Sequence, residues 1–282
     1  TQKNPCPNCM DHGSCPQNEM CACANGWTLP DCSLSLDDFL EMITLKTKLI
    51  KTLNETYENL GSEQDKEFYL SNLASLSNPY FNTNQTLSLI QGILSNHLQL
   101  ANSSVPLTYH EAIYSSNILS NLIKYASQFD CRAETLFTQK LSNDTVSYLD
   151  IISKSDLNEK LSNQDPATIK TDAFDILTFR GTQCYLMENP LTSGQYNPNI
   201  TLLPKDNSTL NCDESFDIKY YAFQEGLFNC SLPYYKLDQT KSSVSLTILD
   251  SQGKDASSQF QMEVVLPPGL DCMKGCSSRG NK

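Results

Sequence analysis

The chain has 282 residues, with 20 basic and 32 acidic side chains, a formal net charge of −12 and only 18% charged residues. A surface of this sign repels a phosphate backbone, so the composition argues against a nucleic-acid-binding protein. No run of 18 apolar residues occurs and no apolar leader follows Thr1, so we expect neither a membrane span nor an uncleaved signal peptide.

The twelve cysteines are the most informative residues, and six of them lie between positions 6 and 32. Cys6 and Cys9 have the spacing of a zinc knuckle, but the single residue between Cys21 and Cys23 is too short a spacer for a second knuckle. The segment holds one tryptophan and almost no aliphatic side chains, so it cannot bury a core and needs covalent cross-links. We therefore expect disulfides in place of a metal, and an extracellular location.

The spacing of these six cysteines is C-x2-C-x5-C-x5-C-x-C-x8-C, with Gly26 and Trp27 before the last one. This pattern resembles the epidermal-growth-factor-like (EGF-like) module of the tenascin type over residues 6–32, and implies a small disulfide-rich domain at 1–33. The resemblance also implies the family's pairing, which is Cys6 with Cys15, Cys9 with Cys21, and Cys23 with Cys32. Calcium-binding members carry acidic residues before their first cysteine, and residues 1–5 have none, so we expect no calcium in this module.

Residues 34–165 are predicted to form a helical domain, because apolar residues recur there every three to four positions. Ser35 is expected to cap the first helix, which ends near Gly61. Thr108 and Glu111 have the spacing of a capping box that opens a fourth helix. Single amphipathic helices cannot bury their apolar stripes alone, so we expect an antiparallel array. The remaining predicted helices are 68–76, 87–98, 133–139 and 157–161.

After Pro166 the apolar period changes to two, and β-branched and aromatic residues replace leucine. Turns rich in Gly, Pro and Asn separate the predicted strands, which favours an antiparallel β-sandwich over residues 166–268. Residues 250–255 are predicted to form a hairpin turn between two strands. The predicted strands are 174–180, 183–187, 216–223, 244–249 and 260–266.

Two further disulfides are predicted in the second half of the chain. Cys212 and Cys230 flank the strand at 216–223 and are expected to join its neighbours. Cys131 and Cys184 are then left to tie the helical part to the sandwich. Four cysteines allow three connectivities, so the other pairings stay open.

A helical half followed by a β-sandwich half is similar to the GAIN-type ectodomain of adhesion receptors and polycystin-like proteins, over residues 34–268. The resemblance is one of architecture and implies an α+β multidomain fold. The self-cleaving His-Leu-Ser/Thr tripeptide of that family is absent, so no autoproteolysis is implied.

Residues 269–282 form a cysteine-containing tail, in which Cys272 and Cys276 precede Arg279-Gly280. This order resembles the opening of a second tenascin-like EGF module at 272–280. Three explanations remain open. The chain is one repeat of a longer protein, or the two thiols bond each other, or their partners come from a neighbouring molecule in a head-to-tail assembly.

Seven Asn-x-Ser/Thr sequons add support for an extracellular location, and we expect N-linked glycans on them. The seven asparagines are Asn54, Asn84, Asn102, Asn143, Asn199, Asn207 and Asn229.

Catalytic motifs fail when tested against the chain. His110-Glu111 begins like a zinc-protease motif, but Tyr114 stands where the second histidine ligand is required. His97 lies among helical apolar residues, and His12 lies inside the cysteine-rich segment. Neither a G-x-S-x-G elbow nor a glycine-rich phosphate loop occurs. We expect no enzymatic activity, no metal and no cofactor.

Together these features predict an extracellular structural or adhesive glycoprotein, as a subunit or repeat of a cell-surface or appendage filament. Its cysteine-rich ends are expected to join copies end to end, and its expected partners are copies of itself or other cell-surface proteins. The alternative prediction is the ligand-binding ectodomain of a cell-surface receptor. A secreted hydrolase ranks third.

Overall fold

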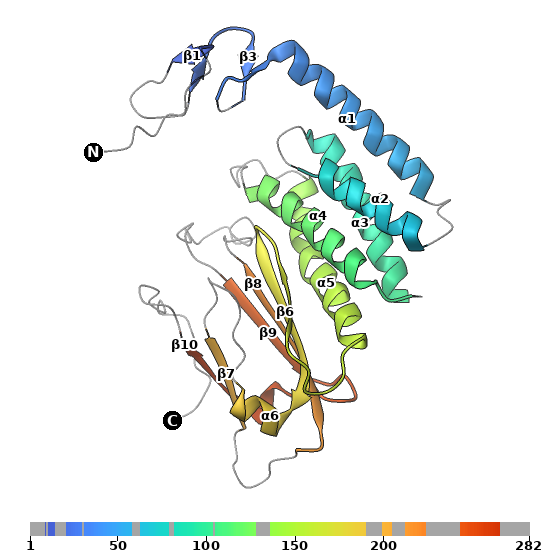
Figure 1. Ribbon diagram of the computed structural model, residues 1–282, viewed down its shortest axis with the longest axis vertical. Coiled ribbons are helices and arrows are strands. Elements are labelled where there is room, and N and C mark those ends of the chain that lie inside the picture. Colours follow the sequence, from blue (N-terminus) through green and yellow to red (C-terminus); the bar gives the residue numbers. More distant parts are fainter. Residues whose placement is uncertain are drawn as a thin grey trace, which may run out of the picture. The chain divides into compact units, whose positions relative to one another are not determined.

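The computed structural model describes residues 9, 11–14, 21–29, 31–57, 63–78, 82–103, 105–127, 136–189, 199–204, 212–223 and 243–265. Helices and antiparallel sheets make it an α+β protein (Figure 1). The chain divides into two compact units, Thr1–Ile93 and Leu94–Lys282. This division falls inside the helical domain expected at 34–165, and the helix α3, Asn84–Ser103, runs across it.

The first unit starts with two small antiparallel hairpins and continues with helices. Strands β1, Gly13–Ser14, and β2, Ala22–Cys23, form one hairpin, and β3, Trp27–Thr28, and β4, Leu34–Ser35, form the other. The helices α1, Leu36–Tyr57, and α2, Glu63–Leu76, follow. The hydroxyl of Ser35 accepts a hydrogen bond from the Asp38 amide at 3.1 Å, so it caps α1 as predicted.

The second unit contains α4, Tyr109–Ser127, and α5, Leu136–Asn158, followed by a sheet. The predicted capping box is present at the start of α4. The Glu111 carboxylate accepts from the Thr108 amide at 2.8 Å, and the Thr108 hydroxyl accepts from the Glu111 amide at 3.2 Å. Glu111 is therefore used in starting the helix.

Four antiparallel strands form the main sheet in the order β5-β6-β8-β9. They are β5, Ala167–Lys170; β6, Phe174–Thr182; β8, Ser215–Phe223; and β9, Ser243–Leu249. A second, two-stranded antiparallel sheet pairs β7, Asn199–Pro204, with β10, Phe260–Val265. Strands β5 and β7 were not predicted from the sequence.

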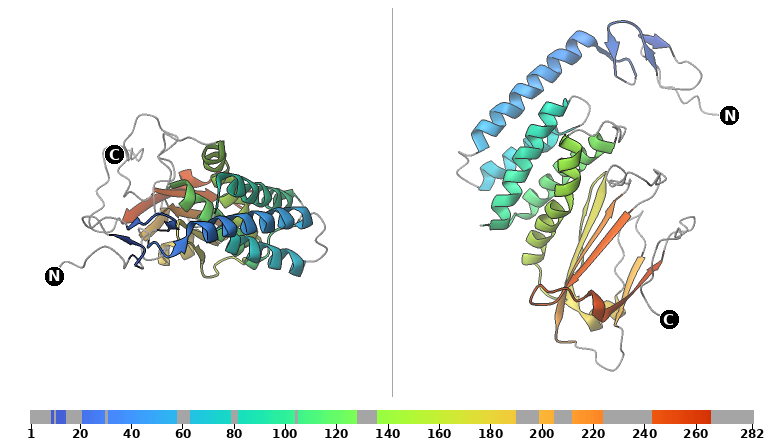
Figure 2. Two further views of the ribbon diagram at one scale, coloured as in Figure 1. Left: turned by 90° about the horizontal axis from the view of Figure 1, so that it is seen from above. Right: turned by 180° about the vertical axis from the view of Figure 1, so that it is seen from behind.

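The two faces of the main sheet have different neighbours (Figures 1 and 2). Alternate residues of β6 and β8 meet α5 on one face, where Lys219 bonds Asp150 and Thr178 bonds Asp156. The other face carries the aromatic and aliphatic core, to which α6, Gln183–Glu188, contributes Leu186 and β10 contributes Phe260. The period-two pattern therefore supplies two buried faces.

Three predicted elements differ from the structure. Residues 183–187 form the helix α6 and not a strand, because the Thr182 hydroxyl accepts from the Tyr185 amide and starts a helical turn directly after β6. The separate helices expected at 133–139 and 157–161 are replaced by the single helix α5. Its polar middle concealed the apolar period, which continues through buried Leu141, Tyr148 and Ile152.

Candidate functional site

The cysteine-rich N-terminal segment is the first candidate binding site. Cys9 bonds Cys21 and Cys23 bonds Cys32, with Cα–Cα distances of 5.8 and 5.3 Å. These are two of the three pairings that the EGF-like resemblance implies, and the third, Cys6 with Cys15, lies outside the described residues. Cys32 is fully buried, so the cross-links form the interior of this segment.

Gly13 lies against this interior. A Cβ atom there would lie 2.7 Å from the Cys32 sulfur and 2.8 Å from the Ala22 carbonyl oxygen. Both distances are too short for a real contact, so β1 needs glycine at this position to approach the Cys23–Cys32 bridge.

An aromatic pair lies beside the bridges. The rings of His12 and Trp27 stack with their centroids 3.4 Å apart and their planes at 5°. The segment continues into α1 without a flexible spacer, because the Leu36 amide donates to the Gly26 carbonyl at 2.7 Å. The hairpins and α1 therefore form one continuous piece of structure.

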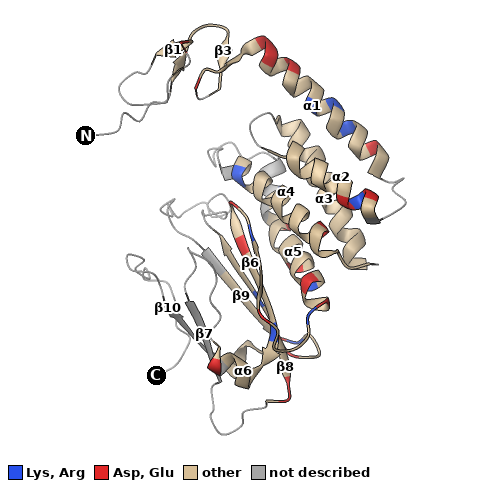
Figure 3. Cartoon of the chain, in the orientation of Figure 1, with Lys and Arg blue, Asp and Glu red and all other residues tan. Residues whose placement is uncertain are grey.

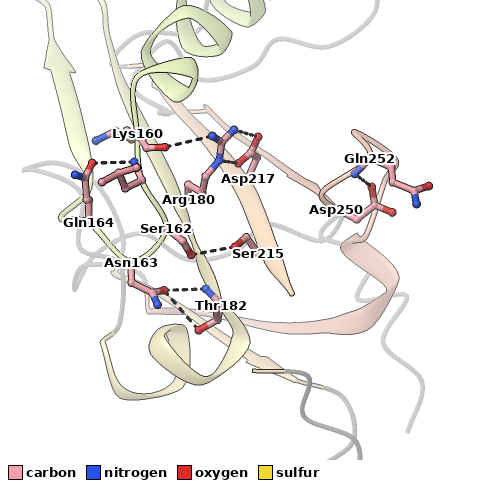
Figure 4. A network of polar contacts seen from close by, with 11 residues as sticks. Lys160, Ser162, Asn163, Gln164, Arg180, Thr182, Ser215, Asp217, Asp250 and Gln252 are labelled. Carbon is pink, nitrogen blue, oxygen red and sulfur yellow. Dashed lines mark hydrogen bonds and ion pairs between the residues drawn. The ribbon is translucent and has the colours of Figure 1, made fainter. Parts of the chain in front are cut away.

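The second candidate site is a polar network between the connection from α5 to β5 and the strands β6 and β8 (Figure 4). The Arg180 guanidinium donates two bonds to the Asp217 carboxylate, at 2.6 and 2.8 Å, and a third to the Lys160 carbonyl at 3.3 Å. These bonds to Asp217 raise the pKa of Arg180. Because the pair is two-pronged, it fixes the orientation of both side chains as well as their distance.

Asn163 extends the network along β6. It adopts a left-handed backbone conformation with φ of 63°, its amide donates to the Arg180 carbonyl at 2.8 Å, and its side chain accepts from the Thr182 amide at 2.9 Å. Ser162 and Ser215 share a hydrogen bond at 3.0 Å next to it. These hydrogen bonds link the connection to β6 and β8, so the network holds the connection against the sheet (Figure 4).

An ion pair between a buried lysine and an exposed carboxylate joins α5 to the sheet. Lys219 of β8 is only 4% exposed and its ammonium donates to the Asp150 carboxylate at 2.6 Å. Beside it, burial raises the pKa of Tyr221 to about 12. Charged residues at alternate positions of apolar strands are the sequence signal for these contacts, which were not predicted.

The third described disulfide corrects a prediction. Cys184 bonds Cys212, so Cys212 is not paired with Cys230, and Cys184 is not paired with Cys131. The reason lies in the strand register, in which Thr182 of β6 pairs with Ser215 of β8. Cys184 and Cys212 follow and precede these residues, so both lie just past the same end of the strand pair. Cys131 and Cys230 lie outside the described residues.

The sequons that the structure describes are open to solvent. Asn54 on α1, Asn84 and Asn102 on α3, and Asn143 on α5 are all exposed. Asn199 lies in β7, and its side chain is not described. Asn207 and Asn229, like the tail cysteines Cys272 and Cys276, lie outside the described residues.

The residues tested for catalysis differ in their exposure to solvent. His97 is buried in α3, whereas His110 is exposed at the start of α4. The predicted turn at 250–255 is present, and the Asp250 carboxylate accepts hydrogen bonds from the amides of Gln252 and Lys254 within it. Leu249 and Asp255 pair antiparallel across the turn, as in a hairpin, whereas the strand β10 that follows belongs to a different sheet from β9.

Within the described ranges, no three or more His, Cys, Asp or Glu side chains are grouped as a metal site would require. None of the described helices is long and apolar enough to cross a membrane. No protein-family model matches the sequence, and no curated protein matches it either.

Proposed function

We propose that this chain is an extracellular structural or adhesive glycoprotein, and that it serves as a subunit or repeat of a cell-surface or appendage filament. In this proposal residues 6–32 are an EGF-like module, residues 34–165 a helical domain and residues 166–268 a β-sandwich. The segments 6–32 and 272–276 are the ends at which copies join. The exposed sequons carry glycans that shield the surface between them.

The observation that carries the proposal is the state of the cysteines. Each of the six that the structure describes is in a disulfide, and two bridges close within the short segment from Cys9 to Cys32. Disulfides persist in oxidising compartments and let a segment without an apolar core keep its shape. A rigid end of this kind suits a coupling element.

The strand pairing, ion pairs and disulfide of the second unit support a mechanical role. Strands β6 and β8 pair over nine residues each, and the Arg180–Asp217 pair and the Cys184–Cys212 bridge reinforce this pairing. The Lys219–Asp150 pair joins β8 to α5. Pulling one strand along the other would break many backbone hydrogen bonds together. These charged side chains bond one another within the protein, and this favours a scaffold over a catalytic site.

Immunogold electron microscopy of the native material tests the location. Antibodies raised against the chain are expected to label extracellular filaments at regular intervals. Label confined to the cell interior, or spread in soluble form with no filament, would contradict the proposal. Non-reducing electrophoresis then tests the end-to-end contact, for which we expect a ladder of multimers that a reductant collapses. A single monomer band without reductant would contradict disulfide joining of the ends.

A further inference from the structure

Helix α1 has an apolar side that faces solvent. Met42, Leu45 and Leu49 are 43%, 58% and 46% exposed and follow one another at spacings of three and four residues. They therefore form a stripe along one side of the helix. We call these three residues the α1 stripe. The stripe runs next to the side that carries the buried residues Lys46 and Ile50.

Charges on α1 change sign along the helix (Figure 3). The first turns carry Asp37, Asp38 and Glu41, and the middle carries Lys48 and Lys51. Glu41 and Lys48 are both exposed, are seven residues apart, and lie on the same edge of the α1 stripe. When two copies of α1 lie antiparallel with Met42 of one against Leu45 of the other, Glu41 of each copy comes next to Lys48 of the other.

The sequon on α1 lies away from the α1 stripe. Asn54 lies nine residues after Leu45, which is about two and a half helical turns, so it projects from the opposite side of α1. Acidic residues beside the stripe and the net charge of −12 disfavour an anionic membrane surface as its partner.

From this complementarity we propose that the α1 stripe is a self-association surface, which binds the same stripe of a second copy in an antiparallel, two-fold arrangement. Met42 and Leu45 of each copy then pack against Leu45 and Met42 of the other, and two Glu41–Lys48 pairs flank them. A two-fold contact closes at a dimer, whereas end-to-end contacts extend into a chain. The proposed surface thus pairs copies laterally and does not depend on the proposed joining of the cysteine-rich ends.

Sedimentation equilibrium of the oxidised chain from about 1 to 200 μM tests this surface. The stripe is small, so we expect a reversible dimer with a dissociation constant on the order of 10 μM or weaker. Leu45→Lys is expected to raise this constant at least about tenfold while leaving the helical circular dichroism unchanged. Leu40→Lys is the matched control, because Leu40 is 53% exposed on α1 but lies nine residues before Leu49, on the other side.

Charge exchange tests the antiparallel arrangement. Glu41→Lys and Lys48→Glu are each expected to weaken the dimer, because each places like charges together, and the double variant is expected to restore it. If Leu45→Lys abolishes the dimer but keeps the multimer ladder in non-reducing electrophoresis, the α1 stripe and the cysteine-rich ends are independent contacts. A chain that stays monomeric throughout, a dimer that Leu45→Lys leaves intact, or a double variant that fails to recover would overturn the proposal.

Discussion

Lys219 and Asp150 form an ion pair whose two members differ in exposure. The Lys219 side chain is 5% exposed and that of Asp150 is 56% exposed, so water reaches one partner and hardly reaches the other. Removing the carboxylate would leave a buried ammonium without its counter-charge, which costs about 3 kcal/mol in comparable sites. Replacing Lys219 by an apolar residue leaves no unpaired charge in the interior, because the remaining Asp150 carboxylate is exposed to water.

We therefore expect Asp150→Asn to lower the free energy of unfolding by about 2 to 4 kcal/mol, and Lys219→Met to be close to neutral. Adding Lys219→Met to Asp150→Asn is expected to recover most of the loss. Calorimetric unfolding measures all three variants. Asp172→Asn is the control, because its pair with Lys124 is exposed and contributes less than about 1 kcal/mol. Equal losses for Asp150→Asn and Asp172→Asn would show that burial does not set the energy.

Lys46 makes the stability of the first unit depend on pH. Burial lowers the pKa of Lys46 to about 8 from its ordinary 10.5. Between these values the unfolded chain binds more protons than the folded chain, so the free energy of unfolding rises with pH across this interval and falls as the pH is lowered toward 8. The ammonium still donates to the Asn78 carbonyl at 2.9 Å, beyond the end of α2, which offsets part of the cost of burial.

Lys46→Met is expected to remove this rise. Denaturant unfolding followed by the fluorescence of Trp27, the single tryptophan, reports on the first unit at pH 7.5, 8.5 and 9.5, values chosen roughly to bracket the titration. Lys51→Met, an exposed lysine on the same helix, should keep the wild-type pH dependence. If the free energy of unfolding still rises with pH in Lys46→Met, another titrating group causes the rise.

At the scale of elements, the predictions succeeded where a local signal and the tertiary packing agreed. Ser35 and the Thr108–Glu111 box begin α1 and α4 as expected, because a cap is satisfied by backbone amides within three residues. The strands β6, β8, β9 and β10 follow the alternation of apolar residues.

The failures have a physical cause in contacts that are distant in sequence. Buried Thr145 donates to the Leu141 carbonyl at 2.6 Å, so a polar residue fills an inward position of α5 and hides its period. The order of β7 and β10 in a sheet of their own, and the pairing of Cys184 with Cys212, depend on which strands meet. Local patterns carry no information on that choice.

The Cys184–Cys212 bridge closes a long loop between β6 and β8. Its sequence separation is 28 residues, for which the chain-entropy treatment gives a stabilisation of about 3 to 4 kcal/mol. The double variant Cys184→Ser and Cys212→Ser is expected to lose about that amount in calorimetric unfolding. The two single variants, each of which leaves one thiol, should lose as much. A loss below about 1 kcal/mol would show that the sheet register alone holds this end together.

At the scale of the whole molecule, the candidate site was predictable in part. The cysteine count and spacing indicated a cross-linked N-terminal segment, and the structure has bridges there. The exposed α1 stripe was not predicted, because apolar residues occur on every side of this helix in the sequence. Only the packing of α1 shows which apolar side stays in contact with water.

An extracellular scaffold of the proposed kind requires oxidised cysteines and glycosylated asparagines. Mass spectrometric peptide mapping of unreduced native material measures both. We predict all twelve cysteines in disulfides, including Cys9–Cys21, Cys23–Cys32 and Cys184–Cys212, and glycans on the exposed sequons, among them Asn54 and Asn143. Free or metal-bound thiols together with unmodified asparagines would contradict the location and the scaffold role alike.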